Sequence, residues 1–153
     1  MANTYSQIYI QIIFSVKYWE NLIKEKYRDE LEKYITGIVK NMNSKLLAIY
    51  CNPDHTHVLI GLDPTISASE IARVIKASSS KWVNQNNWFQ DKFKWQNGFG
   101  VFSYSRSQID TVINYILNQT EHHKKKSFKE EYLEILNKLD IKYNDEYLFE
   151  WFE

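Results

Sequence analysis

Residues 46–62 have the sequence LLAIYCNPDHTHVLIGL, in which two short apolar runs are joined by Asn52, Pro53 and Asp54. Asn, Pro and Asp favour turns. In the second run, apolar or β-branched residues occupy every second position, which is typical of a strand with one buried face. These positions are Thr56, Val58, Ile60 and Leu62. The stretch therefore predicts two successive strands, 46–51 and 55–62, joined by a tight turn.

The segments on either side of this stretch continue with strand and helix patterns. Apolar side chains recur at every second position in residues 5–16 and three or four positions apart in residues 24–43. The helical period returns in residues 67–85, where Ser67 is a suitable N-cap, and a strand pattern follows in 98–104. The order β-α-β-β-α-β predicts an α+β, ferredoxin-like split βαβ fold: a four-stranded antiparallel sheet with two helices on one face.

Two more helices are expected after the last strand. Residues 107–123, with Ser107 as N-cap, and residues 130–139 have helical periodicity, and an acidic, aromatic tail follows. No linker rich in Gly, Ser or Pro divides the chain. We therefore expect one domain over residues 1–153, in which the last helix and the tail occupy about 128–153.

Composition excludes several classes of protein. The 153 residues are 44% hydrophobic and 16% aromatic, which intrinsically disordered chains are not. The single cysteine, Cys51, cannot form an internal disulfide and is expected in the core. No apolar run reaches the roughly 20 residues that span a bilayer, and no signal peptide is evident. We expect a soluble, cytoplasmic protein with no membrane partner.

Charge is distributed unevenly along the chain, although the net charge is zero. Residues 71–126 hold nine Lys and Arg against three Asp and Glu, whereas residues 127–153 hold three against eight. A basic segment of this kind indicates a polyanionic partner or a solvated surface.

Two of the four histidines, His55 and His57, are two positions apart in a predicted strand. Successive strand residues point to opposite faces, so both imidazoles share the face opposite Val58 and Ile60. Two neighbouring imidazoles can bind one divalent metal, or they can serve as hydrogen-bonded polar residues at a strand end. The spacing leaves both interpretations open.

The predicted helix 107–123 has an apolar stripe, and Tyr115 lies off it. Gln119, one turn later, is almost directly above Tyr115 on the same flank. The sheet face that bears His55 and His57 is not covered by the first two helices. We expect helix 107–123 to cover it, which would bring Tyr115 and Gln119 towards the two imidazoles.

Three segments together resemble a known family. They are 53–60 (PDHTHVLI), 95–103 (WQNGFGVFS) and 115–119 (YILNQ). The chain is similar over nearly its whole length to the small single-tyrosine, TnpA-type transposases of bacterial insertion sequences, including those associated with REP sequences, which belong to the HUH endonuclease superfamily. Thr56 departs from the bulky hydrophobic residue usual between the two histidines, and we expect this to affect packing only.

The resemblance implies metal-dependent transesterification on single-stranded DNA. Tyr115 would attack a phosphodiester, leaving a 5′-phosphotyrosine link and a free 3′-hydroxyl. His55, His57 and the side-chain oxygen of Gln119 would hold a divalent metal, Mg²⁺ or Mn²⁺, with no nucleotide cofactor. The resemblance also implies hairpin recognition at the ends of the element and a homodimer, with the tyrosine helix placed over either subunit's histidines.

Within the basic segment, cations alternate with aromatic side chains, a pattern typical of single-stranded nucleic-acid binding. The expected DNA-binding residues are Arg73, Lys76, Lys81, Lys92, Lys94 and Arg106. Most of the aromatics are expected in the core. The run 122–126 (HHKKK) is interpreted as a solvated helix C-terminus, with a supporting role open for His122, and Asp54 as a turn residue that could orient His55.

Two other functions compete with the transposase. A non-catalytic hairpin-binding protein of the same fold would keep its affinity without Tyr115 and would cut no DNA. A metal-dependent hydrolase of small phosphoesters would use His55 and His57 and form no protein-linked product. The presence of Tyr115 and Gln119 together with both histidines favours the transposase.

Overall fold

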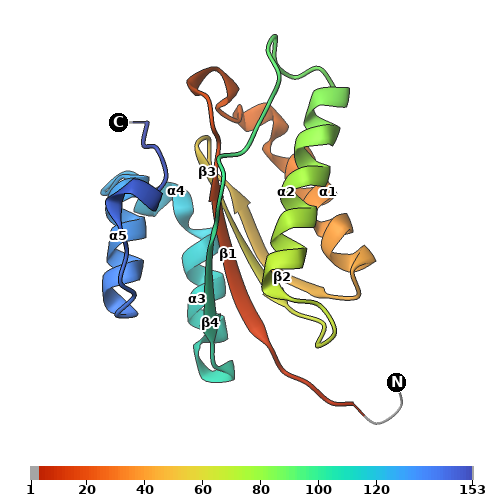
Figure 1. Ribbon diagram of the computed structural model, residues 1–153, viewed down its shortest axis with the longest axis vertical. Helices are drawn as coiled ribbons and strands as arrows, with labels where there is room; N and C mark the ends of the chain where they lie inside the picture. Colours follow the sequence, from red (N-terminus) through yellow and green to blue (C-terminus); the bar gives the residue numbers. More distant parts are fainter. Residues whose placement is uncertain (1–3, 153) are drawn as a thin grey trace.

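The computed structural model describes residues 4–152 and has a four-stranded antiparallel sheet at its centre (Figure 1). The strands are β1 (Tyr9–Ser15), β2 (Lys45–Cys51), β3 (His55–Gly61) and β4 (Gly100–Tyr104), in the order β2-β3-β1-β4. β1 and β3 are the two central strands, and β3 pairs with both β1 and β2. The predicted α+β, ferredoxin-like arrangement is confirmed.

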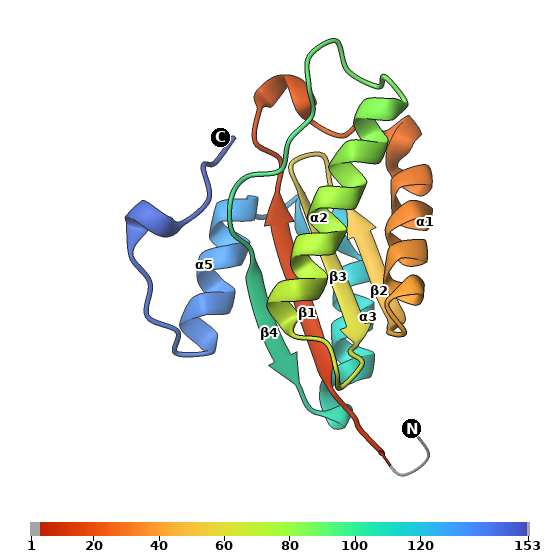
Figure 2. The same ribbon diagram turned by 45° about the vertical axis from the view of Figure 1, so that its right-hand side comes forward.

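Two long helices cover one face of the sheet, α1 (Glu25–Asn41) and α2 (Ala68–Gln85) (Figure 2). Alternate residues of β1 and β3 point into this layer, where Ile12, Phe14, Val58 and Ile60 are fully buried. Ser67 caps α2 as predicted, since its side chain accepts a hydrogen bond from the Glu70 backbone N–H. The period-two pattern of the strands thus builds the main core on this side.

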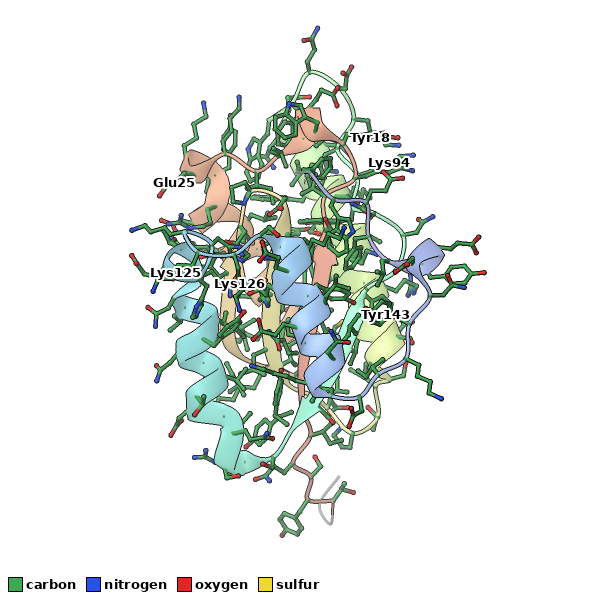
Figure 3. The ribbon with its side chains drawn as sticks, turned by 90° about the vertical axis from the view of Figure 1, so that its left-hand side faces the viewer. Tyr18, Glu25, Lys94, Lys125, Lys126 and Tyr143 are labelled. Carbon is green, nitrogen blue, oxygen red and sulfur yellow. The ribbon has the colours of Figure 1, made fainter. Side chains whose placement is uncertain are left out.

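The opposite face is covered by α3 (Ile109–Leu117), the single-turn α4 (Gln119–His122) and α5 (Phe128–Lys138) (Figure 3). α3 packs against β2 and β3 through Ile109 and Ile116. α5 packs against β1 and β4 through Phe128, Tyr132 and Leu136. The sheet therefore lies between two helical layers, and the face that bears His55 and His57 is enclosed.

Two details of the helices after β4 differ from the prediction. The N-cap is Ser105, not Ser107, because a 3₁₀ turn (Arg106–Gln108) precedes α3 and Gln108 completes a capping box with Ser105. The predicted helix 107–123 is also interrupted at Asn118, which separates α3 from α4. α5 begins two residues before the predicted start, because Ser127 and Glu130 form its capping box.

The tail after α5 folds back over the molecule. It contains a 3₁₀ turn (Asp145–Tyr147), and Phe149 and Trp151 pack on Phe128 and Tyr132. Gln96 binds the backbone of Glu150 twice: its Nε2 donates to the carbonyl at 2.8 Å, and its Oε1 accepts from the N–H at 2.7 Å. The tail thus packs against α5 and is fixed to the rest of the molecule through Gln96. A third 3₁₀ turn (Trp19–Asn21) follows β1.

None of the helices within residues 4–152 has the length and apolar character needed to span a bilayer.

The close packing of α5 on β4 depends on Gly100, the first residue of β4. A Cβ at this position would collide with the Tyr132 hydroxyl and approach the Phe102 ring to 3.0 Å. We expect Gly100→Ala to lower the free energy of unfolding by about 1–3 kcal/mol, the usual cost of overpacking, as measured by urea denaturation. Tyr132→Phe should restore part of this loss.

Gly61→Ala is the matched control, because a Cβ there meets only ordinary contacts, the nearest at 3.7 Å. It should leave the free energy of unfolding within about 1 kcal/mol of wild type. Equal losses in the two variants would show that α5 does not pack on β4 as described.

Candidate metal centre and nucleophile

His55 and His57 lie at the start of β3 and face α3 and α5, as their spacing predicts. Both are buried, with 1% and 0% of the residue exposed. The first ring stacks on Phe128 of α5, with 3.8 Å between centroids. The two imidazoles therefore lie between the sheet and the helices of the second layer.

A carboxylate from α5 occupies the point where these imidazoles converge. The Oε1 atom of Glu131 lies 3.2 Å from the Nε2 atoms of His55, His57 and His123. The ligating atoms of His55, His57 and Glu131 all lie within 4.8 Å of one another. Imidazole nitrogens and a carboxylate oxygen at this separation are a suitable donor set for a divalent first-row ion.

The other oxygen of Glu131 contacts the predicted nucleophile. The Tyr115 hydroxyl donates a hydrogen bond to Oε2, and Gln119 Nε2 donates to the same atom at 3.1 Å. The Tyr115 and His57 rings are 6.2 Å apart between centroids. Tyr115 therefore lies beside the histidines of its own chain, and one carboxylate connects it to them.

Gln119 lies at the centre of the cluster and is fully buried. Its Oε1 accepts a hydrogen bond from Asn52 Nδ2 at 3.0 Å and lies 3.0 Å from His123 Nε2. The structure thus brings together all four residues predicted from the sequence, His55, His57, Tyr115 and Gln119. Their roles as nucleophile and metal ligands stay predictions.

The far side of each imidazole is fixed by a further partner. Asp54 Oδ1 accepts a hydrogen bond from His55 Nδ1 at 2.6 Å, so this turn residue does orient the ring. The Gln11 side chain is hydrogen-bonded to His57 Nδ1 at 2.8 Å, and Tyr104 donates to Gln11 Oε1. Such outer partners hold the Nε2 atoms towards the shared point.

Burial and charge shift the pKa values of the cluster in defined directions. Burial alone would raise the pKa of Glu131, but the charge of His57 and hydrogen bonds from the three histidines hold it well below its usual range. Burial lowers the pKa of His57. For His55 burial acts in the same direction, but Asp54 and Glu131 outweigh it and raise the pKa. Burial and the charge of Glu131 raise the pKa of Tyr115.

Two members of the cluster, His123 and Glu131, were missed at the level of sequence. The interpretation of His123 as part of a solvated helix end is wrong, because its ring contacts both Gln119 and Glu131. His123 continues the four-residue spacing of Tyr115 and Gln119, which was the available signal. For Glu131 the available signal was its position: an acidic residue lies on the apolar stripe of its helix, between Phe128 and Tyr132, where burial is expected. His122 stacks on Tyr115, at 4.3 Å between centroids.

The predicted DNA-binding cations have different surroundings. Lys81, Lys92, Lys94 and Arg106 are exposed and form no ion pair within residues 4–152, whereas Arg73 pairs with Glu70 at 2.6 Å. Lys76 is half-buried and donates to the carbonyls of Gln96 and Gly98. The 3₁₀ turn with Arg106 lies at the lower end of the molecule, far from the loop that follows α2 (Figure 1). The six residues therefore do not form one patch.

The aromatic side chains of the basic segment are mainly structural, as expected. Trp88, Phe93 and Trp95 are buried. Trp82 stacks on Tyr34 and Trp88 stacks on Tyr27, so both rings pack against α1. Cys51 is buried in the core, and burial raises the pKa of its thiol. It is a packing residue, as predicted.

Comparison with known proteins gives one family. The sequence description of the family "Transposase IS200 like" matches residues 4–119. No curated protein matches the chain.

Two solved structures have a similar fold. A proposed transposase from Deinococcus radiodurans R1 is 20% identical, with a TM-score of 0.57 over 76% of this chain and 94% of that one. A REP-associated tyrosine transposase bound to a REP hairpin is 14% identical, with a TM-score of 0.60 over 79% of this chain and 72% of that one. At these identities the likeness concerns the fold.

The donor set predicts that a divalent ion stabilises the protein and that Glu131 contributes to its affinity. We expect Mn²⁺ to raise the midpoint of thermal unfolding. Glu131→Gln should weaken Mn²⁺ binding, measured by calorimetry, by more than about 100-fold, because loss of an outer partner typically costs about 10–100-fold. Melting without metal checks that the variant folds.

Glu134→Gln removes a carboxylate one turn further along α5, where Glu134 pairs with Lys126 and Lys138 at the surface. This control should bind Mn²⁺ as wild type does. Similar affinities in all three proteins would mean that Glu131 is not a ligand.

Proposed function

Because this chain belongs to the IS200-like transposase family, we propose that it cuts and rejoins single-stranded DNA through a covalent link to Tyr115. The observation that carries this proposal is the convergence of the Tyr115 hydroxyl, two imidazoles and a carboxylate in one buried cluster. A DNA-binding protein of the same fold would have no need to place a phenol against such a donor set.

The proposed reaction exchanges one phosphodiester bond for another. The Tyr115 oxygen attacks the scissile phosphorus, a bond forms between them, and the bond from phosphorus to the 3′-oxygen breaks. The leaving oxygen takes up a proton from solvent and becomes a 3′-hydroxyl, and the 5′-phosphate stays on the tyrosine. Since the phosphotyrosyl link retains the bond energy, attack by another 3′-hydroxyl reverses the reaction and joins a new end without a nucleotide cofactor.

Glu131 is placed to take the proton that the phenol must lose, although the transfer is uphill, because its surroundings lower the pKa of Glu131 and raise that of Tyr115. Its Oε2 already accepts the Tyr115 hydrogen bond, and an acceptor within hydrogen-bond reach is the first requirement of a general base. A divalent ion held by His55, His57 and Glu131, with Gln119 as a further oxygen donor, would supply positive charge to polarise the phosphoryl group. Mg²⁺ and Mn²⁺ are both candidates, and the imidazoles favour Mn²⁺.

The proposed substrate is a DNA hairpin with single-stranded flanks at the ends of the mobile element. The REP-bound structure supports this by its fold, and the exposed Lys81, Lys92 and Lys94 supply positive charge for phosphates. The tyrosine already lies over its own chain's histidines, so a single chain contains the whole cluster. The homodimer stays a prediction.

One observation favours a second candidate, the non-catalytic hairpin-binding protein. His55, His57, Gln119 and Glu131 are each at most 2% exposed. A phosphate therefore reaches the cluster only after one of the segments that cover it moves. If no such movement occurs, the protein would bind DNA without cutting it.

The two candidates are separated by the covalent product. We expect the native protein with Mn²⁺ and single-stranded oligonucleotides from the DNA flanking its gene to give a protein–DNA band on a denaturing gel. Tyr115→Phe should abolish the band and leave hairpin affinity unchanged, because it removes only the attacking oxygen. His57→Ala should abolish it through loss of metal.

Tyr34→Phe is the matched control, since it removes the hydroxyl of another half-buried tyrosine, which stacks on Trp82 in the layer of α1 and α2, away from the histidine cluster. It should keep the band. A band that persists in Tyr115→Phe would assign the nucleophile to another residue, and hairpin binding without any band in the native protein would establish the second candidate.

The salt dependence of binding tests the cations of the loop that follows α2. Each lysine that contacts a phosphate of single-stranded DNA contributes about 0.7 to the slope of log affinity against log salt concentration. We expect Lys92→Ala and Lys94→Ala each to reduce the slope by about that amount, as measured by fluorescence anisotropy. Lys129→Ala, exposed on α5, should leave it unchanged; an equal change there would contradict a localised contact.

A further inference from the structure

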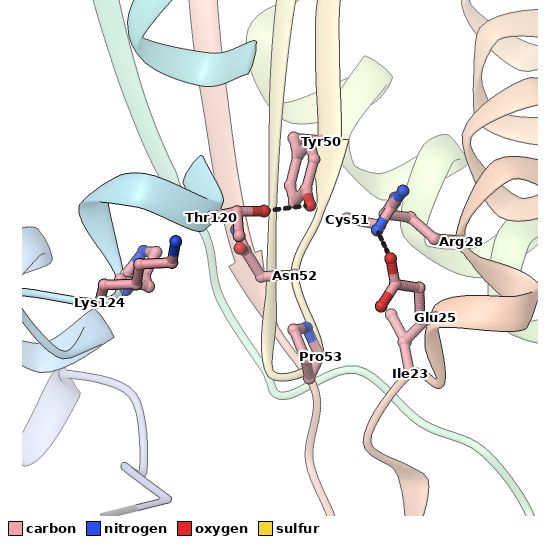
Figure 4. A pocket seen from close by; sticks show the side chains of 10 residues that line it. Ile23, Glu25, Arg28, Tyr50, Cys51, Asn52, Pro53, Thr120 and Lys124 are labelled. Atoms are coloured by element: carbon pink, nitrogen blue, oxygen red, sulfur yellow. Dashed lines mark hydrogen bonds and ion pairs between the residues drawn. The ribbon is translucent and has the colours of Figure 1, made fainter. Parts of the chain in front are cut away.

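A cavity of about 280 Å³ lies next to the histidine cluster, between the end of β2, the start of α1 and α4 (Figure 4). Asn52 and His123 line it and also belong to the cluster, through Gln119 and Glu131 respectively. The cavity is therefore separated from the metal-binding side chains by single residues.

The side chains around the cavity suit a nucleotide. The Arg28 guanidinium lies over the Tyr50 ring at 5.0 Å, and both are groups on which unpaired bases stack. The Tyr50 and Thr120 hydroxyls are hydrogen-bonded at 2.7 Å, and Lys124 adds a cation at the rim (Figure 4). Arg28 and Lys124 are balanced by Glu25 and Glu121, at 3.2 and 3.0 Å.

The cavity and the Tyr115 hydroxyl contact the cluster through different side chains. Contacts run from the Tyr115 hydroxyl to one oxygen of Glu131, from the other oxygen to His123, and from His123 to the cavity. In phosphoryl transfer the attacking and leaving oxygens are roughly in line across the phosphorus. A scissile phosphate placed between Tyr115 and His123 would have its leaving 3′-oxygen on the His123 side, next to the cavity.

The hollow on the tyrosine side is much smaller. It has a volume of about 90 Å³ and is lined by Tyr115, His122 and residues of α5. Small-molecule sites usually have about 300–1,000 Å³; the cavity of about 280 Å³ comes close to the lower limit, whereas the hollow of about 90 Å³ is far below it. The two volumes therefore favour binding of a nucleotide in the cavity and not in the hollow beside Tyr115.

We propose that this cavity binds the nucleotide on the 5′ side of the scissile phosphate, the one that leaves with the free 3′-hydroxyl. The inference rests on the proposed function, since it assumes that Tyr115 is the nucleophile. Its base stacks against Arg28 and Tyr50, and Lys124 faces its 5′-phosphate. Binding of this nucleotide keeps its 3′-hydroxyl beside the phosphotyrosine. There the hydroxyl can attack the phosphotyrosine and restore the strand, or be replaced by the 3′-hydroxyl of another strand.

Photocrosslinking locates the nucleotide directly. Once the covalent band has mapped the cut, Tyr115→Phe protein is irradiated with oligonucleotides that carry 4-thiothymidine either just before or just after that position. The nucleotide before the cut should crosslink to the peptides that contain Arg28, Tyr50 or residues 120–124, and the nucleotide after it should not. Crosslinks of the preceding nucleotide to other peptides would overturn the proposal.

Filling the cavity tests the same point kinetically. Thr120→Trp should raise the concentration of a 3′-hydroxyl strand needed for half-maximal joining to the preformed phosphotyrosine by about tenfold, the effect of losing one stacked base. Thr111→Trp is the control, because it places the same bulk on the exposed side of α3, away from the cavity. It should stay within about twofold of wild type.

Equal behaviour of Thr120→Trp and Thr111→Trp would overturn the proposal while leaving the transposase chemistry intact. If Thr120→Trp does not fold, as shown by its thermal unfolding, the crosslinking result decides. Absence of any covalent band in the native protein would instead contradict the proposed function, and this inference with it.

Discussion

The carboxylate of Glu131 is the group on which the second layer of the molecule depends. A buried charge costs several kcal/mol unless partners compensate for it, and Glu131 is 2% exposed. Three imidazoles surround one oxygen, and Tyr115 and Gln119 donate to the other. Because these partners come from β3, α3 and the residues after it, α5 can dock in only one position. The contacts that satisfy the charge also assemble the candidate site.

The sheet can support both a core and a reactive cluster because its side chains alternate. On β1, Ile12 and Phe14 enter the apolar layer under α1 and α2, while Gln11 and Ser15 point the other way and are also buried. Gln11 holds His57, and Ser15 donates to the Asp54 carbonyl in the turn before His55. One strand therefore supplies packing to one layer and hydrogen-bond partners to the other, which makes the histidine geometry a property of the central sheet.

The sequence was sufficient for those parts of the molecule that local periodicity determines. Period two placed His55 and His57 on one face, and the four-residue spacing placed Gln119 above Tyr115. Glu131 and His123 were not predicted as members of the site, because their surroundings depend on how α5 packs on β4. That packing requires Gly100 and the tail that Gln96 anchors. The break at Asn118 and the cap at Ser105 are likewise set by how α3 and α4 fit the sheet.

The family match ends at residue 119, so the tyrosine, the two histidines and the glutamine lie within it, whereas His123 and Glu131 lie beyond it. The Glu131 carboxylate has an electrostatic consequence. Its charge, together with burial, raises the pKa of Tyr115 and keeps the phenol protonated. The same charge attracts cations to the imidazoles that face its other oxygen. A positive charge near Glu131 Oε1 partly neutralises the carboxylate. The carboxylate then raises the pKa of the Tyr115 phenol less, because the phenol contacts the other oxygen of the same group. The pKa of the Tyr115 phenol therefore depends on the charge of the histidine cluster.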